Sequence, residues 1–374
     1  MTQASWHFLT PEYPPDPGGV ADYTQLLVTG LARYGEVVHV WAPATGRDGR
    51  DEGASVHRTS GFDARGLRAL ERRLSEFASP RRLFVQYVPT SLGFRGMNVP
   101  LIRWLRDWPE DLWVQFHEVS LGWQLWRKPH LHVIHGVQSW MASTLARRAD
   151  RLFVSIDAWR GRLGREGERA TWLPVPSNLP TDPEAAELER FRVRLGRGPW
   201  IAHFGTYGSS ITRLLLPTLD RIAHSSPGVR FLLLGRGAQR VAELLPKERV
   251  NALGPLSAGS VAAALSVADL ALQPYPDGIS TRRSSAMAAL ALGVPLVSNS
   301  GPLTESFWDA DVVALGKTRR PAELAQLCLS LLGDATRRDA LARNGLRLYN
   351  ERFAVERTLE ALLPSRDGTL AGDR

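Results

Sequence analysis

Two series of short apolar runs, each alternating with amphipathic stretches, run through this sequence of 374 residues. Short apolar runs are typical of buried parallel strands, and the amphipathic stretches between them are typical of helices that cover such a sheet. A proline-rich, polar segment, PVPSNLPTDPEAAE, separates the two series and indicates a linker. The length suits two domains of about 150 to 200 residues each. The sequence therefore predicts an α/β protein with two domains.

The predicted strands fall into six in each half. In the first half they are Trp6–Leu9, Val37–Trp41, Leu83–Tyr87, Trp113–Phe116, Leu152–Ser155 and Trp172–Pro174. In the second half they are Trp200–Phe204, Arg230–Leu234, Val250–Leu253, Leu270–Gln273, Pro295–Ser298 and Val312–Leu315. We expect residues 1–178 to form the N-terminal domain and residues 196–348 the C-terminal domain. Residues 349–374 would form a helix and tail, for which packing back on the N-terminal domain stays open.

Composition and charge narrow the class of protein. Apolar residues make up 44% and charged residues 22% of the chain, as in ordinary globular proteins. No apolar run reaches the roughly 18 residues that a membrane span needs, and the N-terminus lacks the features of a signal peptide. We therefore expect a cytoplasmic protein. Cys328, the only cysteine, lies in an apolar helical run and is predicted to be part of the core.

The formal net charge is +8, and most of it comes from arginine. This charge suits an anionic substrate, and it leaves a peripheral contact with the inner face of a membrane open. Nucleic acid is not expected as a partner, because the chain has no basic run with interleaved aromatic residues and no zinc-finger spacing. The sequence does not distinguish a monomer from a homodimer.

Ligands of open parallel sheets bind beyond the carboxyl ends of the strands. If two such sheets face each other, the site lies in the cleft between the domains. Polar and glycine-rich segments directly after the predicted strands are therefore the candidates for the site.

In the first half, Gly18 and Gly19 lie between a strand and a helix, where backbone amides can approach an anionic ligand. His117, in Phe116-His117-Glu118, follows the fourth strand and could hydrogen-bond a sugar hydroxyl. The plainer interpretations are a turn and a structural histidine. Residues that could line an acceptor are Gln86, Tyr87, Arg95, Glu118 and Trp123, with Trp126 as an alternative to Trp123.

In the second half, the loop GTYGSSITR follows a strand and contributes Gly205, Thr206 and Arg213, a set that suits a diphosphate. Gly235 begins GRGAQR, a poor match to a dinucleotide fingerprint, but it would allow close approach of a nucleobase or pyrophosphate. The pair Asp309-x-Asp311 resembles a metal-binding pattern of some sugar transferases. It precedes a strand, so no metal site is predicted there.

The segment QPYPDGISTRRSSAMAALALGVP is the richest in candidates. We predict that a helix begins near Ser280 or Thr281, with Arg282 and Arg283 in its first turn. Cations are normally disfavoured at a helix N-terminus, so two arginines there indicate a bound anion such as a diphosphate. The plainer interpretation is solvated surface arginine. Further candidates for binding the donor are Asp277, Gly278, Ser280, Thr281 and Glu305.

The chain resembles the GT-B fold glycosyltransferases, specifically the retaining family 4 group. The resemblance lies in PPDPGGVADYTQLLVTGLARYGEVVHVW, FHE, ADRLFVS and LSVADLALQPYPDG…MAALALGVPLVS, in this order along nearly the whole chain. It implies two Rossmann-like domains facing each other across a cleft, with the acceptor bound by the first and a nucleotide diphosphate sugar by the second. It further implies that His117 contacts the donor sugar, that the Gly18-Gly19 loop lies over the phosphates, and that Arg213 binds the diphosphate.

The sequence departs from this family at one motif. The family usually carries two glutamates eight residues apart before its GxP turn, and the corresponding positions here are Ser280 and Ala288. Their contacts to donor sugar and ribose would have to come from elsewhere, with Asp277, Glu305 and the amides at the helix start as candidates.

The function expected from these features is transfer of a sugar, of the hexosyltransferase type, from a nucleotide diphosphate donor to an acceptor hydroxyl in carbohydrate biosynthesis. We expect retention of configuration and no metal or other cofactor. Arg213 and Arg282 would stabilise the leaving diphosphate, and His117 would orient the donor sugar. Uridine is the default base, and the acceptor could be a carbohydrate, a lipid-linked molecule or a small molecule. Two alternatives stay open: a nucleotide-sugar epimerase of the same architecture, and a non-catalytic sugar-nucleotide-binding protein.

Overall fold

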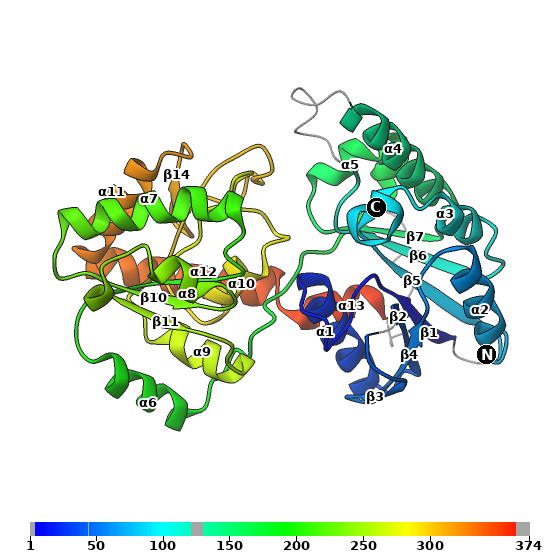
Figure 1. The fold of residues 1–374 in the computed structure, drawn as a ribbon, viewed down its shortest axis with the longest axis horizontal. Helices are drawn as coiled ribbons and strands as arrows, with labels where there is room; N and C mark the ends of the chain where they lie inside the picture. The colour runs from blue at the N-terminus through cyan, green and yellow to red at the C-terminus, as the bar shows by residue number, and fades with distance from the viewer. Residues whose placement is uncertain (1–3, 44, 121–129, 364–374) are drawn as a thin grey trace. The chain divides into compact units, whose positions relative to one another are not determined.

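The computed structural model describes residues 4–43, 45–120 and 130–363 (Figure 1). Its internal contacts divide the chain into two units, of which the first is Met1–Pro174 together with Val355–Arg374 and the second is Val175–Ala354. The chain passes to the second unit at Val175, whose amide donates to the carbonyl of Thr281 (2.8 Å). The chain returns to the first unit at Val355. For comparison, the domain ends were predicted at residues 178 and 348.

The first unit contains an eight-stranded sheet with the order β3-β4-β2-β1-β5-β6-β7-β8. All neighbouring strands are parallel except β3 and β4, which are antiparallel. The strands are β1 (Ser5–Leu9), β2 (Val38–Pro43), β3 (Gly49–Asp51), β4 (Ala54–Thr59), β5 (Arg81–Tyr87), β6 (Asp111–Phe116), β7 (Arg151–Val154) and β8 (Thr171–Trp172). The central strands are buried along nearly their whole length, as expected for a sheet covered by helices.

Helices connect these strands. They are α1 (Gly19–Arg33), α2 (Ala64–Leu74), α3 (Val99–Arg106), α4 (His130–Arg148), α5 (Ala158–Arg162) and α13 (Val355–Leu362), with short 3₁₀ turns at Pro89–Ser91, Phe94–Gly96 and Gly164–Arg169. Asp63 caps α2 by accepting a hydrogen bond from the amide of Gly66 (2.7 Å), and three leucines three or four residues apart, Leu67, Leu70 and Leu74, face the core. The C-terminal helix α13 lies beside α1 (Figure 1).

The second unit contains a six-stranded parallel sheet with the order β11-β10-β9-β12-β13-β14. The strands are β9 (Trp200–Phe204), β10 (Arg230–Leu234), β11 (Val250–Leu253), β12 (Leu270–Leu272), β13 (Leu296–Asn299) and β14 (Ala314–Gly316). The helices are α6 (Ala185–Leu195), α7 (Ser209–Ser225), α8 (Ala238–Ala242), α9 (Ala258–Ser266), α10 (Ser284–Ala291), α11 (Pro321–Leu332) and α12 (Ala335–Arg352), with a 3₁₀ turn at Lys247–Arg249.

One core cluster of the second unit lies between this sheet and the helices α7 and α11, which pack side by side (Figure 1). Ile201, Leu233 and Leu272 contribute strand side chains to it, and Leu219 contributes from α7. Cys328 is fully buried in the same core, which confirms its predicted structural role.

All twelve predicted strands are present, with ends shifted by a few residues. Strands β3 and β4, a short hairpin that extends the first sheet beyond β2, were not predicted. In β4, ASVHRT, buried and half-buried residues alternate and no long apolar run marks the strand. Such a strand is specified by its pairing with a neighbour more than by its own hydrophobicity.

Candidate functional site

The carboxyl ends of β9, β10, β12 and β13 lie along one edge of the second sheet, because these strands are parallel neighbours. Two of the predicted glycines meet there. Gly235 has a φ of +105°, and a Cβ at this position would lie 2.4 Å from the carbonyl oxygen of Gly205. The close approach of the two loops therefore requires glycine at 235. Thr206, next to Gly205, is exposed.

Asp277, Arg282 and Arg283 form one ion-pair cluster after β12. One carboxylate oxygen of Asp277 pairs with Arg282 and the other with Arg283. The three side chains are largely buried, with exposed fractions of 19%, 18% and 24%. Burial alone would raise the pKa of Asp277, but the charges of Arg283 and Arg282 outweigh this effect and hold the pKa below its usual value. The cluster thus carries two cations and one carboxylate.

The predicted start of the following helix was wrong. Helix α10 begins at Ser284, so Arg283 is the residue before it and Arg282 lies in the preceding turn. The backbone at Thr281 is committed elsewhere: its amide donates to Glu305 (3.1 Å), and its carbonyl accepts from Val175. Because the backbone of Thr281 makes these two tertiary hydrogen bonds, residues 281–283 form a turn and the helix begins only at Ser284. The arginines therefore stand before the N-terminus of α10. The amides of Ala286 and Met287 donate to the carbonyl of Arg283 (2.9 and 3.1 Å), whereas those of Ser284 and Ser285 precede the first intrahelical hydrogen bond.

Glu305 holds this turn in place. One of its oxygens accepts hydrogen bonds from both the amide and the hydroxyl of Thr281 (3.1 and 2.6 Å), and the other accepts from the indole of Trp308 (2.8 Å). Burial raises the pKa of Glu305 above its usual value despite these hydrogen bonds. Its contacts make Glu305 a support for the loop that carries the arginines.

Tyr275 and Asn299 belong to the same loop system but were not predicted. The guanidinium of Arg283 lies over the ring of Tyr275 at 4.8 Å, and the Tyr275 hydroxyl lies 2.8 Å from that of Ser285 in α10. Asn299 accepts from the amide of Tyr275 and donates to its carbonyl (2.9 and 2.8 Å). Tyr275 lies within the segment singled out above, but its stacking contact depends on a loop geometry that the sequence does not reveal.

Several buried polar atoms at this edge have no hydrogen-bond partner among the described residues. They are Nε2 of His203, both side-chain amide atoms of Gln273, and the hydroxyl of Ser280. Buried polar groups nearly always have a hydrogen-bond partner. Several unpaired ones at the carboxyl-terminal edge of a sheet are therefore typical of a ligand-binding site. His203 was not predicted as a site residue, because it lies within the apolar run of a predicted strand.

His203 has a defined protonation state. Its Nδ1 donates to the carbonyl of Leu272 (2.8 Å), and burial lowers its pKa to about 4. The ring is therefore neutral at pH 7, and the unpaired Nε2 is a hydrogen-bond acceptor.

Arg213 is exposed in the second turn of α7, and it is not part of the cluster around Asp277. The loop before α7 is shaped by Tyr207, which has a φ of +56° and donates from its hydroxyl to the carbonyl of His203 (3.1 Å). Gly278 also has a left-handed φ, +87°, and a Cβ there would meet the hydroxyl of Thr304 at 2.2 Å. Ala288 is fully buried in α10.

In the first unit, His117 lies just after β6 and is almost fully buried. Its Nε2 donates to the side-chain carbonyl of Gln86 (2.7 Å), and Tyr23 contacts the ring edge-on at 5.1 Å between centroids. Burial lowers the pKa of His117 to about 3, so the ring is neutral and its Nδ1 can accept a hydrogen bond. The indole of Trp159 donates to the His117 carbonyl (2.9 Å), which fixes the backbone.

The Gly18-Gly19 segment already faces an anion supplied by the protein. One carboxylate oxygen of Glu12 accepts from the amides of Val20 and Ala21 (3.0 and 3.3 Å) at the start of α1. A Cβ on Gly18 would lie 2.0 Å from this carboxylate, whereas one on Gly19 would meet nothing within 4 Å. Glu12 was not predicted, because the bond joins residues separated by a proline-rich loop.

The predicted acceptor residues differ in their surroundings. Tyr87 is fully buried, and no described residue bonds to its hydroxyl. Arg95 is exposed and has a left-handed φ of +53°. Glu118 is half-buried, with Thr90 donating to it at 3.4 Å. Trp123 and Trp126 lie outside the described residues.

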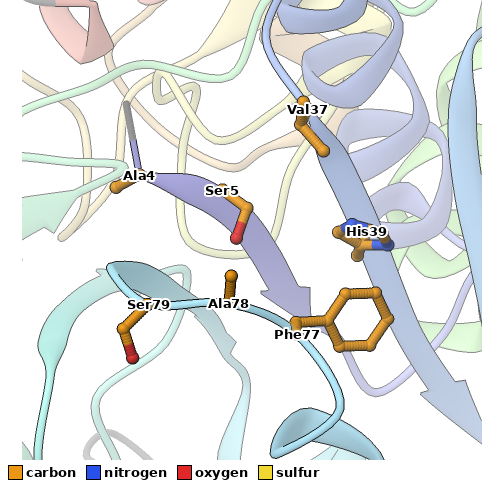
Figure 2. Close-up of a pocket in the computed structure, with 7 residues that line it drawn as sticks. All are labelled: Ala4, Ser5, Val37, His39, Phe77, Ala78 and Ser79. Atoms are coloured by element: carbon orange, nitrogen blue, oxygen red, sulfur yellow. The ribbon is translucent and has the colours of Figure 1, made fainter. Parts of the chain in front are cut away.

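A separate pocket lies at the opposite, amino-terminal edge of the first sheet (Figure 2). It has a volume of about 270 Å³ and is lined by His39, Phe77, Ser5, Val37 and neighbouring residues. His39 belongs to a stack of imidazole rings with His7 (4.8 Å) and His57 (5.3 Å). None of these residues follows a strand end, and none was predicted to be functional.

Within residues 4–43, 45–120 and 130–363, no group of three or more His, Cys, Asp or Glu side chains could hold a metal ion. Asp309 instead accepts a hydrogen bond from the amide of Asp311 (3.0 Å) in an exposed turn. The described helices include none that is both long and apolar enough to span a membrane.

No protein-family model matches the sequence, and no curated protein matches it. Solved structures do match the fold. A sucrose-phosphate synthase from Thermosynechococcus elongatus superposes with a TM-score of 0.75 at 15% identity, over 96% of this chain and 97% of that one. HepE from Anabaena, in complex with UDP-glucose, gives 0.71 at 15% identity, over 96% and 98%.

A third match is a UDP-forming α,α-trehalose-phosphate synthase from Burkholderia vietnamiensis, with a TM-score of 0.65 at 13% identity, over 96% of each chain. All three chains are covered almost completely, so the likeness extends to both units. The protein therefore has the GT-B fold of glycosyltransferases, built from two Rossmann-like units.

Proposed function

We propose that the protein is a glycosyltransferase that moves a sugar from a nucleotide diphosphate donor to an acceptor hydroxyl. The observation that carries the proposal is the pair of largely buried arginines, Arg282 and Arg283, before the N-terminus of α10. Cations and helix amides together favour a phosphate group. The unpaired polar atoms of His203, Gln273 and Ser280 at the same sheet edge support a polar ligand there.

The chemistry requires a group that stabilises the departing diphosphate. When the bond between the sugar C1 and the donor oxygen breaks, negative charge grows on the leaving group. Arg282, Arg283 and the amides of α10 supply positive potential for that charge without a metal ion, and Arg213 adds a further cation. We propose that the leaving phosphate assists the incoming hydroxyl on the same face of the sugar, which gives retention.

His117 would orient the donor sugar. Because burial keeps its ring neutral, it serves as a hydrogen-bond acceptor for a sugar hydroxyl and not as a general acid. Gln86 supports this role by holding Nε2, which leaves Nδ1 to accept from the ligand. Tyr87, Arg95, Glu118 and Trp123 would contact the acceptor.

Neutral groups would replace the two glutamates that family 4 enzymes usually carry. The hydroxyl of Ser280 stands at the first of these positions, and the side chain of Gln273 is available at the same edge of the sheet. Glu305 is bonded to Thr281 and Trp308, so it would support the donor loop without binding the donor directly. The loss of both acidic residues also favours a second candidate, a non-catalytic protein that binds sugar nucleotides.

The proposal also covers the donor base, the acceptor and the location of the protein. HepE was solved with UDP and with UDP-glucose, and on that basis we propose uridine as the donor base. The acceptor would be a carbohydrate, a lipid-linked molecule or a small molecule. We also propose a location in the cytoplasm, and the net charge of +8 is compatible with contact with anionic lipid at the inner membrane face.

A two-stage experiment tests the proposal. A thermal-shift screen of nucleoside diphosphates and their sugars should identify a donor, because a ligand that binds only the native state raises the Tm. The donor is then incubated with mono- and disaccharide acceptors, and released nucleoside diphosphate is measured. Binding with transfer or donor hydrolysis supports the transferase. Binding without either supports the non-catalytic candidate, and absence of binding contradicts both.

A further inference from the structure

The arginine cluster before α10 already contains an anion of its own. Asp277 pairs with Arg282 and Arg283 through different oxygens, so both carboxylate atoms are engaged. The charges of the two arginines hold the pKa of Asp277 low, so its carboxylate is ionised at neutral pH. A diphosphate that approaches these arginines therefore meets a fixed negative charge that is bonded to the same guanidinium groups.

The backbone that carries Asp277 is held in place beside the arginines. Its carbonyl accepts from the amide of Leu303 (3.0 Å), and the amide of Gly278 donates to the carbonyl of Tyr275 (3.1 Å). The neighbouring backbone is equally close, since a Cβ on Gly301 would lie 2.5 Å from the carbonyl of Asp277. Arg283 is fixed from its other side by the ring of Tyr275. A diphosphate must therefore share the arginines with Asp277 or draw them from it.

We propose that Asp277 is an internal counter-anion: it stabilises the arginine pair in the empty protein and weakens the binding of the nucleoside diphosphate product. This inference rests on the proposed function and assigns Asp277 a role opposite in sign to that of Arg282 and Arg283. A site with two unopposed arginines would hold its diphosphate product tightly, whereas one opposing carboxylate favours product release.

The inference predicts two changes of opposite direction in Asp277→Asn. Without the carboxylate, repulsion between the arginines is uncompensated, so the Tm of the unliganded protein should fall. Affinity for the diphosphate should rise, because the like charge beside it is gone. For partly buried charges at low ionic strength we expect binding about threefold to tenfold tighter. Consequently, the same ligand should shift the Tm of the variant by more than that of the wild type.

The experiment measures both quantities on the full chain. Isothermal titration at about 0.05 M salt, where exposed charges are weakly screened, compares wild type with Asp277→Asn, using UDP, ADP, GDP, TDP and inorganic pyrophosphate as probes. Asp339→Asn is the matched control, because it makes the same change at an exposed position on α12 of the same unit. The control should bind as the wild type does.

Tighter binding with a lower unliganded Tm supports the inference. Unchanged or weaker binding in Asp277→Asn, with wild-type binding intact, overturns it and makes Asp277 a positioning residue for the arginines. If no probe binds wild type or variant, the proposed function fails as well, so the two failures are distinguishable. Should Asp277→Asn not fold, Asp277→Ser removes the same charge with a residue common in turns, and the same comparison applies.

Discussion

One carboxylate in each unit occupies a position where an anionic ligand was expected. Glu12 accepts hydrogen bonds from the first amides of α1, and Asp277 pairs with both arginines before α10. In both places the electrostatics that would attract a phosphate also attract an acidic side chain. In both segments an acidic side chain of the protein therefore occupies the position predicted for an anion.

At the residue scale, we expect Arg282→Ala to reduce kcat/KM for sugar transfer about 100-fold, as found when one stabilising donor is removed from a transition state. The fold should survive, because Asp277 keeps Arg283 as a partner. Steady-state kinetics with the donor identified by the screen provides the measurement. Arg221→Ala, which removes an exposed arginine from α7, is the control and should leave the rate unchanged. Wild-type kinetics in Arg282→Ala would remove this residue from the mechanism.

The cap on α1 permits a second prediction. Gly18→Ala places a methyl group on the Glu12 carboxylate, so the side chain must leave the amides of Val20 and Ala21. Loss of this cap should cost about 1 kcal/mol of unfolding free energy, and Glu12→Ala should cost about the same. The double variant should cost no more than either alone, because both changes remove one interaction.

Urea denaturation measures these values, and Gly19→Ala serves as the control, since a Cβ there meets nothing within 4 Å. Gly19→Ala should not destabilise the protein, because alanine favours a helix more than glycine does. Unchanged stability in Gly18→Ala would contradict the role of the Glu12 cap.

At the scale of elements, α13 packs against α1 within the first unit. The close approach depends on Gly30, where a Cβ would lie 2.6 Å from one methyl of Leu359. Leu359 is buried in this contact. A helix that forms hundreds of residues later along the chain therefore completes the surface of α1.

We expect Gly30→Ala to destabilise the protein by about 1 to 3 kcal/mol, the usual cost of overpacking. Leu359→Ala removes the obstructing side chain, so adding it to Gly30→Ala should cost less than the sum of the two single changes. Denaturant midpoints of the four proteins give the coupling energy. Strict additivity would contradict the contact between α1 and α13.

At the scale of the whole molecule, both units bury neutral histidines. Burial lowers the pKa of His7 and His117 to about 3 and that of His39 and His203 to about 4. The hydrogen bonds agree for His7, whose Nδ1 accepts from the indole of Trp41 (3.1 Å) and is therefore unprotonated. Each of these groups binds a proton more readily in the unfolded chain than in the folded protein.

These lowered pKa values make the free energy of unfolding depend on pH. An unfolded histidine titrates near pH 6.5, so stability is complete above this pH and decreases as the pH falls from about 6.5 toward 4. Each group contributes a slope of up to about 1.4 kcal/mol per pH unit within its window. Denaturant unfolding measured between pH 7 and 4 should show the loss. His39→Phe, which keeps a ring in the stack, should reduce the slope. A flat profile would contradict burial of neutral histidines.

The amino-acid sequence by itself determined the two α/β halves, twelve of the strands and the loops in which polar residues follow them. These features depend on local hydrophobic periodicity and on glycine and proline, which act over a few residues. It also determined that Arg282 and Arg283 lie beside a helix start, although not on which side.

Only the tertiary structure decided how the candidate residues are paired. Asp277 engages both arginines within one loop, Glu305 reaches Thr281 from another loop, and Glu12 accepts from backbone amides at the start of α1. The hairpin that contains β4 likewise depends on β2 for its pairing. Such contacts depend on backbone positions set by the whole sheet, and a one-dimensional pattern of hydrophobicity carries no record of those positions.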